Sequence, residues 1–245
     1  CSRPVSISVV AVTKKKKIVN DLIDGQGNPT IATYAKTGEV HIRVTASAED
    51  EKAAMKLIKP MVKELKSRFG NDIYSTEEET TLEKSVADLL VANKLTLACA
   101  ESCTGGMLSA RLVNVPGISE VYKSGVITYS NKAKRRFLGV KKGTLQKHGA
   151  VSRQTAEEMA KGACLMLKAD VSAAVTGIAG PDGGTAEKPV GLVYIACSVK
   201  GKTTVKEFRF SGNREKIRES AVSAALTLMR GCILEYYSKV TFGKK

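Results

Sequence analysis

The chain has 245 residues, 43% of them hydrophobic, and a net charge of +15 at neutral pH. No apolar run approaches the roughly 18 residues that a membrane span needs, and no signal-peptide pattern opens the chain. We therefore expect a soluble, cytoplasmic protein with no membrane partner. Its length favours two structural units, and its first residue, Cys1 in place of Met, indicates a fragment of a longer chain.

The positive charge belongs mainly to the second part of the chain. Residues 1–80 carry 13 basic and 11 acidic side chains, whereas residues 81–245 carry 26 and 13. A basic domain suggests an anionic partner such as nucleic acid, a nucleotide or a phosphorylated metabolite. The alternative is an ordinary solvated surface.

The cysteines and histidines argue against a metal site. Six cysteines are scattered through mostly apolar stretches with no C-x-x-C motif, and only two histidines, His41 and His148, are present. Neither a zinc site nor a disulfide framework fits this distribution. We expect reduced thiols, no bound metal and no cofactor.

The first part of the chain, residues 1–75, predicts a small α+β module of βαββα order, and residues 76–81 a polar linker. Gly25–Pro29 should end the helix expected at Lys15–Ile23, and Pro60 argues against the continuity of the helix expected at Ala48–Phe69. The expected elements are a strand at 5–12, a helix at Lys15–Ile23, a hairpin of Thr30–Ala35 and Val40–Thr45, and a helix at Ala48–Phe69.

The second part, residues 82–245, alternates helices and strands and closes with a hairpin. This order predicts a three-layer α/β/α sandwich on a mixed sheet. The expected elements are a helix from Leu82, a strand at Leu95–Ala100, a helix from Thr104, a strand at Gly125–Ser130, helices from Asn131 and Ser152, a strand at Val171–Val175, a hairpin of Gly191–Val199 and Thr203–Phe210, and a helix from about Asn213.

The stretch from Glu101 to Gly106 is the first candidate for chemistry. A buried strand passes through Glu101, Ser102 and Cys103 into two glycines that open a helix. Unpaired N–H groups at a helix start beside the Ser102 hydroxyl would stabilise an oxyanion. The alternative is a structural turn capped by Ser102 or Thr104.

A serine nucleophile needs a base, and the sequence offers two. His148 lies in a polar loop, so a Ser–His arrangement is poorly supported. Lys134 lies five residues after Tyr129, so an amine and a phenol could face one pocket. Neighbouring cations would lower the pKa of Lys134, although an ordinary exposed helix lysine is the simpler interpretation.

Other residues near these strand ends leave alternatives open. Cys103 competes with Ser102, because a thiol at a helix N-terminus has a lowered pKa. The glycine-rich loop Gly177–Gly184 matches neither a P-loop nor a dinucleotide motif. Arg214 and Arg218 lie one turn apart, spaced to bind an anion together or to be solvated.

Four long motifs in one order closely resemble the C-terminal domain of the CinA family over about residues 80–245. They are Ala100–Gly106, Gly125–Lys134, Gly149–Ser152, and Thr176–Thr185 with Lys188–Gly191. The resemblance implies a nicotinamide mononucleotide deamidase, a serine amidase that needs no metal. It implies Ser102 as nucleophile, Lys134 and Tyr129 as proton-transfer residues, and substrate contacts by Thr176 and Arg214. We also expect substrate contacts by Thr104, Gly105, Gly106 and Gly177, and we expect Glu101 to orient either the substrate or a neighbouring hydroxyl.

Residues 1–75 are similar to the KH-like middle module of the same family, chiefly at Asn28–Tyr34. The chain thus corresponds to the C-terminal two-domain part of a CinA protein. The alternative function is a nucleic-acid-binding or oligomerisation module with little amidase activity. No G-x-x-G occurs in residues 1–80, so nucleic acid is an unlikely partner, and we expect the module to set the geometry of a homo-oligomer.

Overall fold

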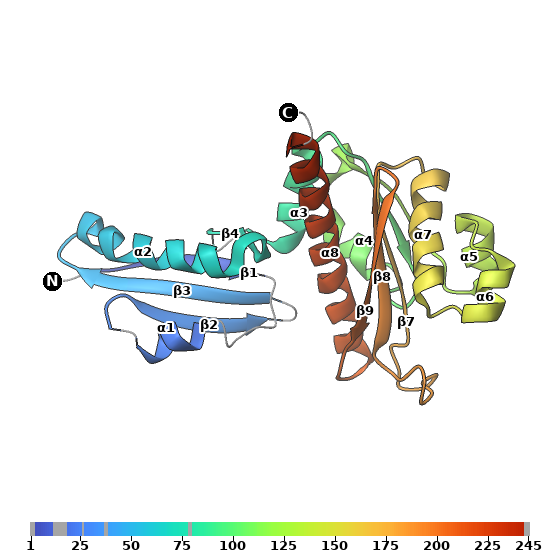
Figure 1. Ribbon diagram of the computed structural model, residues 1–245, viewed down its shortest axis with the longest axis horizontal. Coiled ribbons are helices and arrows are strands. Elements are labelled where there is room, and N and C mark those ends of the chain that lie inside the picture. Colours follow the sequence, from blue (N-terminus) through green and yellow to red (C-terminus); the bar gives the residue numbers. More distant parts are fainter. Residues whose placement is uncertain (1–2, 12–18, 26, 37–38, 78–79, 243–245) are drawn as a thin grey trace. The chain divides into compact units, whose positions relative to one another are not determined.

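The computed structural model describes residues 3–11, 19–25, 27–36, 39–77 and 80–242 (Figure 1). The chain divides into two compact units, Cys1–Thr81 and Leu82–Lys245.

The first unit is a four-stranded antiparallel sheet in the order β2-β3-β1-β4, covered by the long helix α2. Alternate residues of β3, among them Ile42 and Val44, are fully buried, and α2 contributes Ile58 and Leu65 to the same core. The elements are β1 (Arg3–Ala11), α1 (Asn20–Asp24), β2 (Thr30–Lys36), β3 (Glu39–Ala48), α2 (Glu51–Phe69) and β4 (Ile73–Ser75).

The predicted β2–β3 hairpin is confirmed, and two boundaries of this unit need correction. Helix α2 begins at Glu51, because β3 continues to Ala48 and the Asp50 carboxylate caps the helix by accepting from the Ala53 N–H. The helix continues through Pro60. Most of the helix expected from Lys15 lies outside the described residues. Strand β4 was not predicted.

The second unit is built on a five-stranded mixed sheet in the order β6-β5-β7-β8-β9. Strands β6, β5 and β7 run parallel, β8 pairs antiparallel with β7, and β9 pairs antiparallel with β8. The central strands are buried on both faces, as near-continuous apolar runs require. The strands are β5 (Leu97–Glu101), β6 (Tyr122–Ile127), β7 (Val171–Gly177), β8 (Leu192–Val199) and β9 (Lys202–Arg209).

Helices cover both faces of this sheet (Figure 1). Helix α8 packs on one face with α3 and α4, and α7 packs on the other with α5 and α6 outside it. The helices are α3 (Leu82–Ala92), α4 (Met107–Val113), α5 (Asn131–Leu138), α6 (Lys142–His148), α7 (Arg153–Met166) and α8 (Arg214–Phe242). The expected three-layer sandwich, preceded by a small α+β module, is therefore confirmed.

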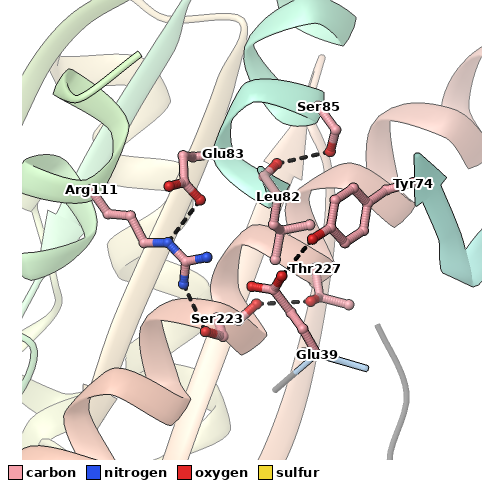
Figure 2. A network of polar contacts seen from close by, with 8 residues as sticks. All are labelled: Glu39, Tyr74, Leu82, Glu83, Ser85, Arg111, Ser223 and Thr227. Atoms are coloured by element: carbon pink, nitrogen blue, oxygen red, sulfur yellow. Dashed lines mark hydrogen bonds and ion pairs between the residues drawn. The ribbon is translucent and has the colours of Figure 1, made fainter. Parts of the chain in front are cut away.

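A polar network holds α3, α4 and α8 together on their shared face (Figure 2). The Arg111 side chain of α4 donates to Glu83 of α3 and to Ser223 of α8, both at 2.8 Å. Figure 2 also draws the bond from the Tyr74 hydroxyl to the Glu39 carboxylate within the first unit.

Several boundaries in the second unit also differ from expectation. Strand β6 ends at Ile127, and α4 begins at Met107 instead of Thr104. His148 is the last residue of helix α6, where the sequence indicated a loop. Ser152 caps α7 as predicted, accepting from the Thr155 N–H at 3.2 Å.

Close packing of α5 against α7 depends on one glycine. A Cβ at Gly162 of α7 would lie 1.9 Å from the carbonyl oxygen of Leu138, the last residue of α5. Backbone atoms cannot yield as a flexible side chain can, so only glycine fits here.

We predict that Gly162→Ala lowers the free energy of unfolding by about 1–3 kcal/mol, because α5 must move away from α7. Gly231→Ala in α8 is the matched control, since nothing lies within 4 Å of its added Cβ. It should stabilise the protein by about 0.5–1 kcal/mol through helix propensity. Urea unfolding checks both, and equal effects would contradict the packing role of Gly162.

Candidate active site

The parallel register places three hydroxyl residues side by side at the ends of β6, β5 and β7. Glu101 is paired with Ile127 on one side and with Val175 on the other. The ladder continues one step, with the Thr128 N–H donating to Glu101 O at 2.7 Å and the Ser102 N–H donating to Val175 O at 2.9 Å. Thr128, Ser102 and Thr176 thus occupy one row at the carboxyl edge of the sheet, where ligands bind in such folds.

Lys134 reaches this row from the first turn of α5. Its ammonium donates to the Ser102 hydroxyl at 2.9 Å and to the Thr128 carbonyl at 2.7 Å. Ser130 caps α5 by accepting from the Ala133 N–H, which fixes the helix start relative to β6. Lys134 is 1% exposed and Ser102 is 8% exposed. The structure therefore brings together the two residues that the sequence proposed as nucleophile and base.

Burial gives Lys134 the properties of a base. Desolvation lowers the pKa of its ammonium to about 8, and the nearby Cys103 side chain opposes this weakly. The sequence analysis attributed the lowering to neighbouring cations, but the cations near Lys134 in sequence, Lys132, Arg135 and Arg136, are exposed on α5. The cause is therefore the loss of water around Lys134.

Cys103 lacks the reactivity that its expected place at a helix start implied. The helix begins four residues later, and the thiol is buried. Desolvation raises the pKa of Cys103 to about 11, so the side chain stays a thiol at neutral pH. His148 lies at the end of α6, and among the described residues no hydrogen bond joins its ring to Ser102.

Glu101 is bound to the protein on both carboxylate oxygens. One oxygen accepts the N–H groups of Gly106 and Leu108 at 2.9 and 3.1 Å. The other accepts the N–H and hydroxyl of Ser109 at 2.9 and 2.6 Å. Glu101 is 1% exposed and caps the start of α4. Of the two roles expected for it, the carboxylate therefore holds a neighbouring hydroxyl, that of Ser109, in place of a substrate.

This cap determines which N–H groups of the turn are available. Gly105 donates to Ser102 O at 3.1 Å and Gly106 donates to Glu101, so neither glycine N–H is left for a substrate. Both glycines have positive φ, 59° and 98°, which explains their residue type. Among the described residues, no other residue accepts from the N–H groups of Cys103 and Thr104, which directly follow the Ser102 peptide.

Tyr129 and Arg214 form a separate pair at the exposed side of the site. Arg214 donates to the Tyr129 hydroxyl at 2.9 Å and to Gly180 O at 2.7 Å. Tyr129 is 60% exposed, and no hydrogen bond links it to Lys134 in the described part of the chain. Arg218 instead donates to the carbonyls of Cys103 and Thr104, so the two arginines do not share one anion site.

Thr176 and Gly177 end β7 next to Ser102. The Thr176 hydroxyl donates to Ala150 O at 2.8 Å, which ties the turn before α7 to the sheet edge. A Cβ at Gly177 would lie 2.6 Å from the Val193 side chain, so close strand packing requires glycine there. The strand register places Thr176 beside Ser102 and Gly177 one position further along β7.

Sequence reasoning missed Thr128 and Ser109 as parts of this site, and it named Arg218 only as a possible anion-binding partner of Arg214. Thr128 could have been found from the strand register, because it follows β6 as Ser102 follows β5. Ser109 carries no local signal, and the spacing of Arg218 from Arg214 could not show its partners, because these contacts depend on how α4 and α8 pack.

Two further findings concern metal ligands and membrane-spanning helices. Within the described ranges, no group of three or more His, Cys, Asp or Glu side chains is arranged to hold a metal ion. No helix in the same ranges is long and apolar enough to cross a membrane.

The fold and this site define an α/β/α domain with a buried Ser–Lys pair at the edge of a mixed sheet, preceded by a small α+β module. Family models match both parts: the CinA C-terminal domain over residues 79–233 and the damage-inducible protein CinA KH domain over residues 15–75. The chain belongs to the CinA family.

Relatives agree with this assignment. A competence-damage inducible protein of Clostridium novyi is 48% identical over 94% of this chain and 55% of its own length. One from Clostridioides difficile is 53% identical over 86% of this chain and 52% of its own length. The chain thus spans about half the length of the curated relatives it matches.

Solved structures match nearly two thirds of the chain. The competence/damage inducible protein CihA of Agrobacterium tumefaciens is 42% identical, with a TM-score of 0.58, covering 62% of this chain and 96% of that chain. A CinA superfamily protein of Escherichia coli is 36% identical, with a TM-score of 0.59, covering 66% and 96%.

We predict that Glu101→Gln lowers the free energy of unfolding by about 1–3 kcal/mol, because its amide group would face backbone N–H donors. Glu219→Gln, at an exposed position of α8, should stay within about 0.5 kcal/mol of the wild type. Thermal unfolding of the two variants tests this. Equal stability of Glu101→Gln and Glu219→Gln would contradict the capping role.

Proposed function

We propose that the second unit is a nicotinamide mononucleotide deamidase, which hydrolyses the amide of the nicotinamide ring to give nicotinic acid mononucleotide and ammonia. The observation that carries the proposal is the 2.9 Å hydrogen bond between the Lys134 ammonium and the Ser102 hydroxyl in a nearly water-free position. A lysine whose pKa is lowered to about 8 is neutral often enough at neutral pH to remove a serine proton.

The first half of the reaction forms an acyl-enzyme. Ser102 Oγ attacks the amide carbon while its proton passes to neutral Lys134, and the carbonyl electrons move onto oxygen. The N–H groups of Cys103 and Thr104 are the donors available to this oxyanion. When the carbonyl re-forms, the C–N bond breaks, and Lys134 returns the proton to the leaving nitrogen as ammonia departs.

The second half releases the acid. Water attacks the ester carbon, Lys134 accepts a proton from that water, and Ser102 recovers a proton as the ester bond breaks. The products are the ring carboxylic acid and free Ser102. One lysine serves both halves, because it is regenerated neutral after ammonia leaves.

The exposed pair Tyr129 and Arg214 suits the substrate-facing side of this site. Arg214 uses two of its five N–H donors on the protein, which leaves donors for an anionic substrate group. The family resemblance implies a role for Tyr129 in proton transfer. Because Tyr129 bonds to Arg214 and Lys134 bonds to other groups, a substrate contact by Tyr129 fits the geometry better. The excess of cations in residues 81–245 favours a phosphorylated substrate. The homo-oligomer remains a prediction.

We predict that Ser102→Ala abolishes ammonia release from nicotinamide mononucleotide, whereas Cys103→Ala retains most of it, because the buried thiol is protonated. A coupled ammonia assay measures both, with free nicotinamide as the control substrate. Full activity in Ser102→Ala would overturn the assignment, and loss of activity only in Cys103→Ala would move the nucleophile to the thiol.

We predict that Lys134→Met also abolishes ammonia release yet changes the pH dependence of stability. In the wild type the pKa of Lys134 rises from about 8 to 10.5 on unfolding, so the unfolded state binds more protons between these values. Wild-type stability relative to the variant should therefore increase by about 2–3 kcal/mol between pH 7 and 10. Urea unfolding at several pH values measures this difference. A constant difference would contradict the lowered pKa.

A further inference from the structure

Two buried hydroxyls at the site have no hydrogen-bond partner among the described residues. They belong to Thr104 and Thr128, and both residues are 0% exposed. Buried polar atoms are almost always paired, because leaving one unpaired is costly. Both residues adjoin the Ser102–Lys134 pair, since Thr104 lies two positions after Ser102 and the Thr128 carbonyl accepts from Lys134.

The Lys134 ammonium has more N–H donors than the described residues have acceptors for it. An ammonium has three N–H donors, and the described residues provide two acceptors, the Ser102 hydroxyl and the Thr128 carbonyl. At 1% exposure, the remaining donor has little access to bulk water. One donor without a partner therefore lies beside the residue that carries an acceptor without a partner.

The Thr128 backbone holds this hydroxyl near the amine. Its N–H donates to Glu101 O at 2.7 Å and its carbonyl accepts from Lys134 at 2.7 Å, so the peptide is fixed on both sides. Only rotation about the Cα–Cβ bond remains, among three staggered positions.

We infer that the Thr128 hydroxyl, by rotation about its Cα–Cβ bond, accepts the third N–H of the charged Lys134 amine, both in the free protein and during catalysis, and is thus a positioning residue for the base. This inference rests on the amide hydrolysis proposed above. When Ser102 Oγ bonds to the amide carbon, it becomes a poor acceptor for Lys134 at the moment the lysine gains a proton. The Thr128 hydroxyl then remains as the side-chain acceptor for Lys134, and no covalent bond forms or breaks at Thr128.

The other charged and titratable groups near Lys134 do not accept a hydrogen bond from its amine in the described part of the chain. From the turn after β5 comes the Cys103 thiol, which is neutral at pH 7. Glu101 of β5 is held by the start of α4. From α8, Arg218 binds the carbonyls of the same turn, and Arg214 binds Tyr129.

Helix α7 packs against α5 and also carries charges. Glu157 pairs with Lys161 at 2.5 Å, and Glu158 accepts from the Lys141 N–H and the Thr144 hydroxyl. Within the described residues, no carboxylate bonds to the Lys134 amine. A hydroxyl acceptor would therefore be a substantial source of stabilisation for its charged form.

The test compares Thr128→Val, Thr128→Ser and Thr104→Val. NMR of the ¹³Cε resonance of Lys134, assigned by its loss in Lys134→Met, follows the titration of the amine without any substrate. Removing an acceptor for the charged form lowers the pKa. We expect the Lys134 midpoint, near 8 in the wild type, to fall by about 0.5 or more in Thr128→Val.

Activity and stability complete the comparison. The plateau rate of ammonia release should fall about tenfold in Thr128→Val, as expected for one lost hydrogen bond to a charged group. Thr128→Ser should restore both midpoint and rate. Thr104→Val, which removes the other unpartnered hydroxyl, should leave the Lys134 midpoint unchanged. Thr128→Val should unfold at or above the wild-type temperature, because it removes an unpaired buried hydroxyl.

An unchanged midpoint in Thr128→Val, or a Thr128→Ser variant that behaves like Thr128→Val, would overturn the inference. If the wild type releases no ammonia while Thr128→Val still lowers the Lys134 midpoint, the positioning role stands and the proposed substrate is wrong. If ammonia is released and the midpoint does not move, the proposed function stands and the inference fails.

Discussion

The burial of the Lys134 amine against Ser102 and Thr128 is the interaction on which the second unit depends. An ammonium at 1% exposure is unfavourable, and the cost lowers its pKa to about 8. The same desolvation that weakens the fold makes the amine a base at neutral pH. The surrounding structure must therefore hold Lys134 in place, which the Ser130 cap of α5 and the close contact of α5 with Gly162 of α7 both do.

Glu101 fixes the turn that carries Ser102, and it too is a buried charged group. Its buried carboxylate is paired with the N–H groups that open α4 and with the Ser109 hydroxyl, so a negative charge meets the positive end of a helix. Because Glu101 takes the N–H of Gly106, the helix start is closed to a ligand. The N–H groups of Cys103 and Thr104 next to Ser102 remain, and they are the donors that the proposed reaction would use for its oxyanion.

Patterns that depend on neighbours in sequence were predictable, whereas contacts that depend on tertiary packing were not. Alternating apolar residues gave the β2–β3 hairpin, and Ser152 marked the start of α7. The pairing of Ser102 with Lys134 followed from their places after parallel strands. Strand β4 is too short to show a period, α6 has a single buried residue, Leu145, and the role of Glu101 required knowing where α4 begins.

The hydroxyls of Thr104 and Thr128 are exceptions to the rule that buried hydroxyls are hydrogen-bonded. Elsewhere in the second unit, buried hydroxyls such as those of Thr155, Thr176 and Ser172 donate to a main-chain carbonyl. Thr104 and Thr128 break that pattern, Thr104 two positions after Ser102 and Thr128 at the carbonyl that Lys134 binds. A fold selected for stability alone would replace Thr128 with valine, which has the same shape and no polar atom. The reaction proposed above instead gains from a hydroxyl that can turn toward the charged Lys134 amine when Ser102 is acylated.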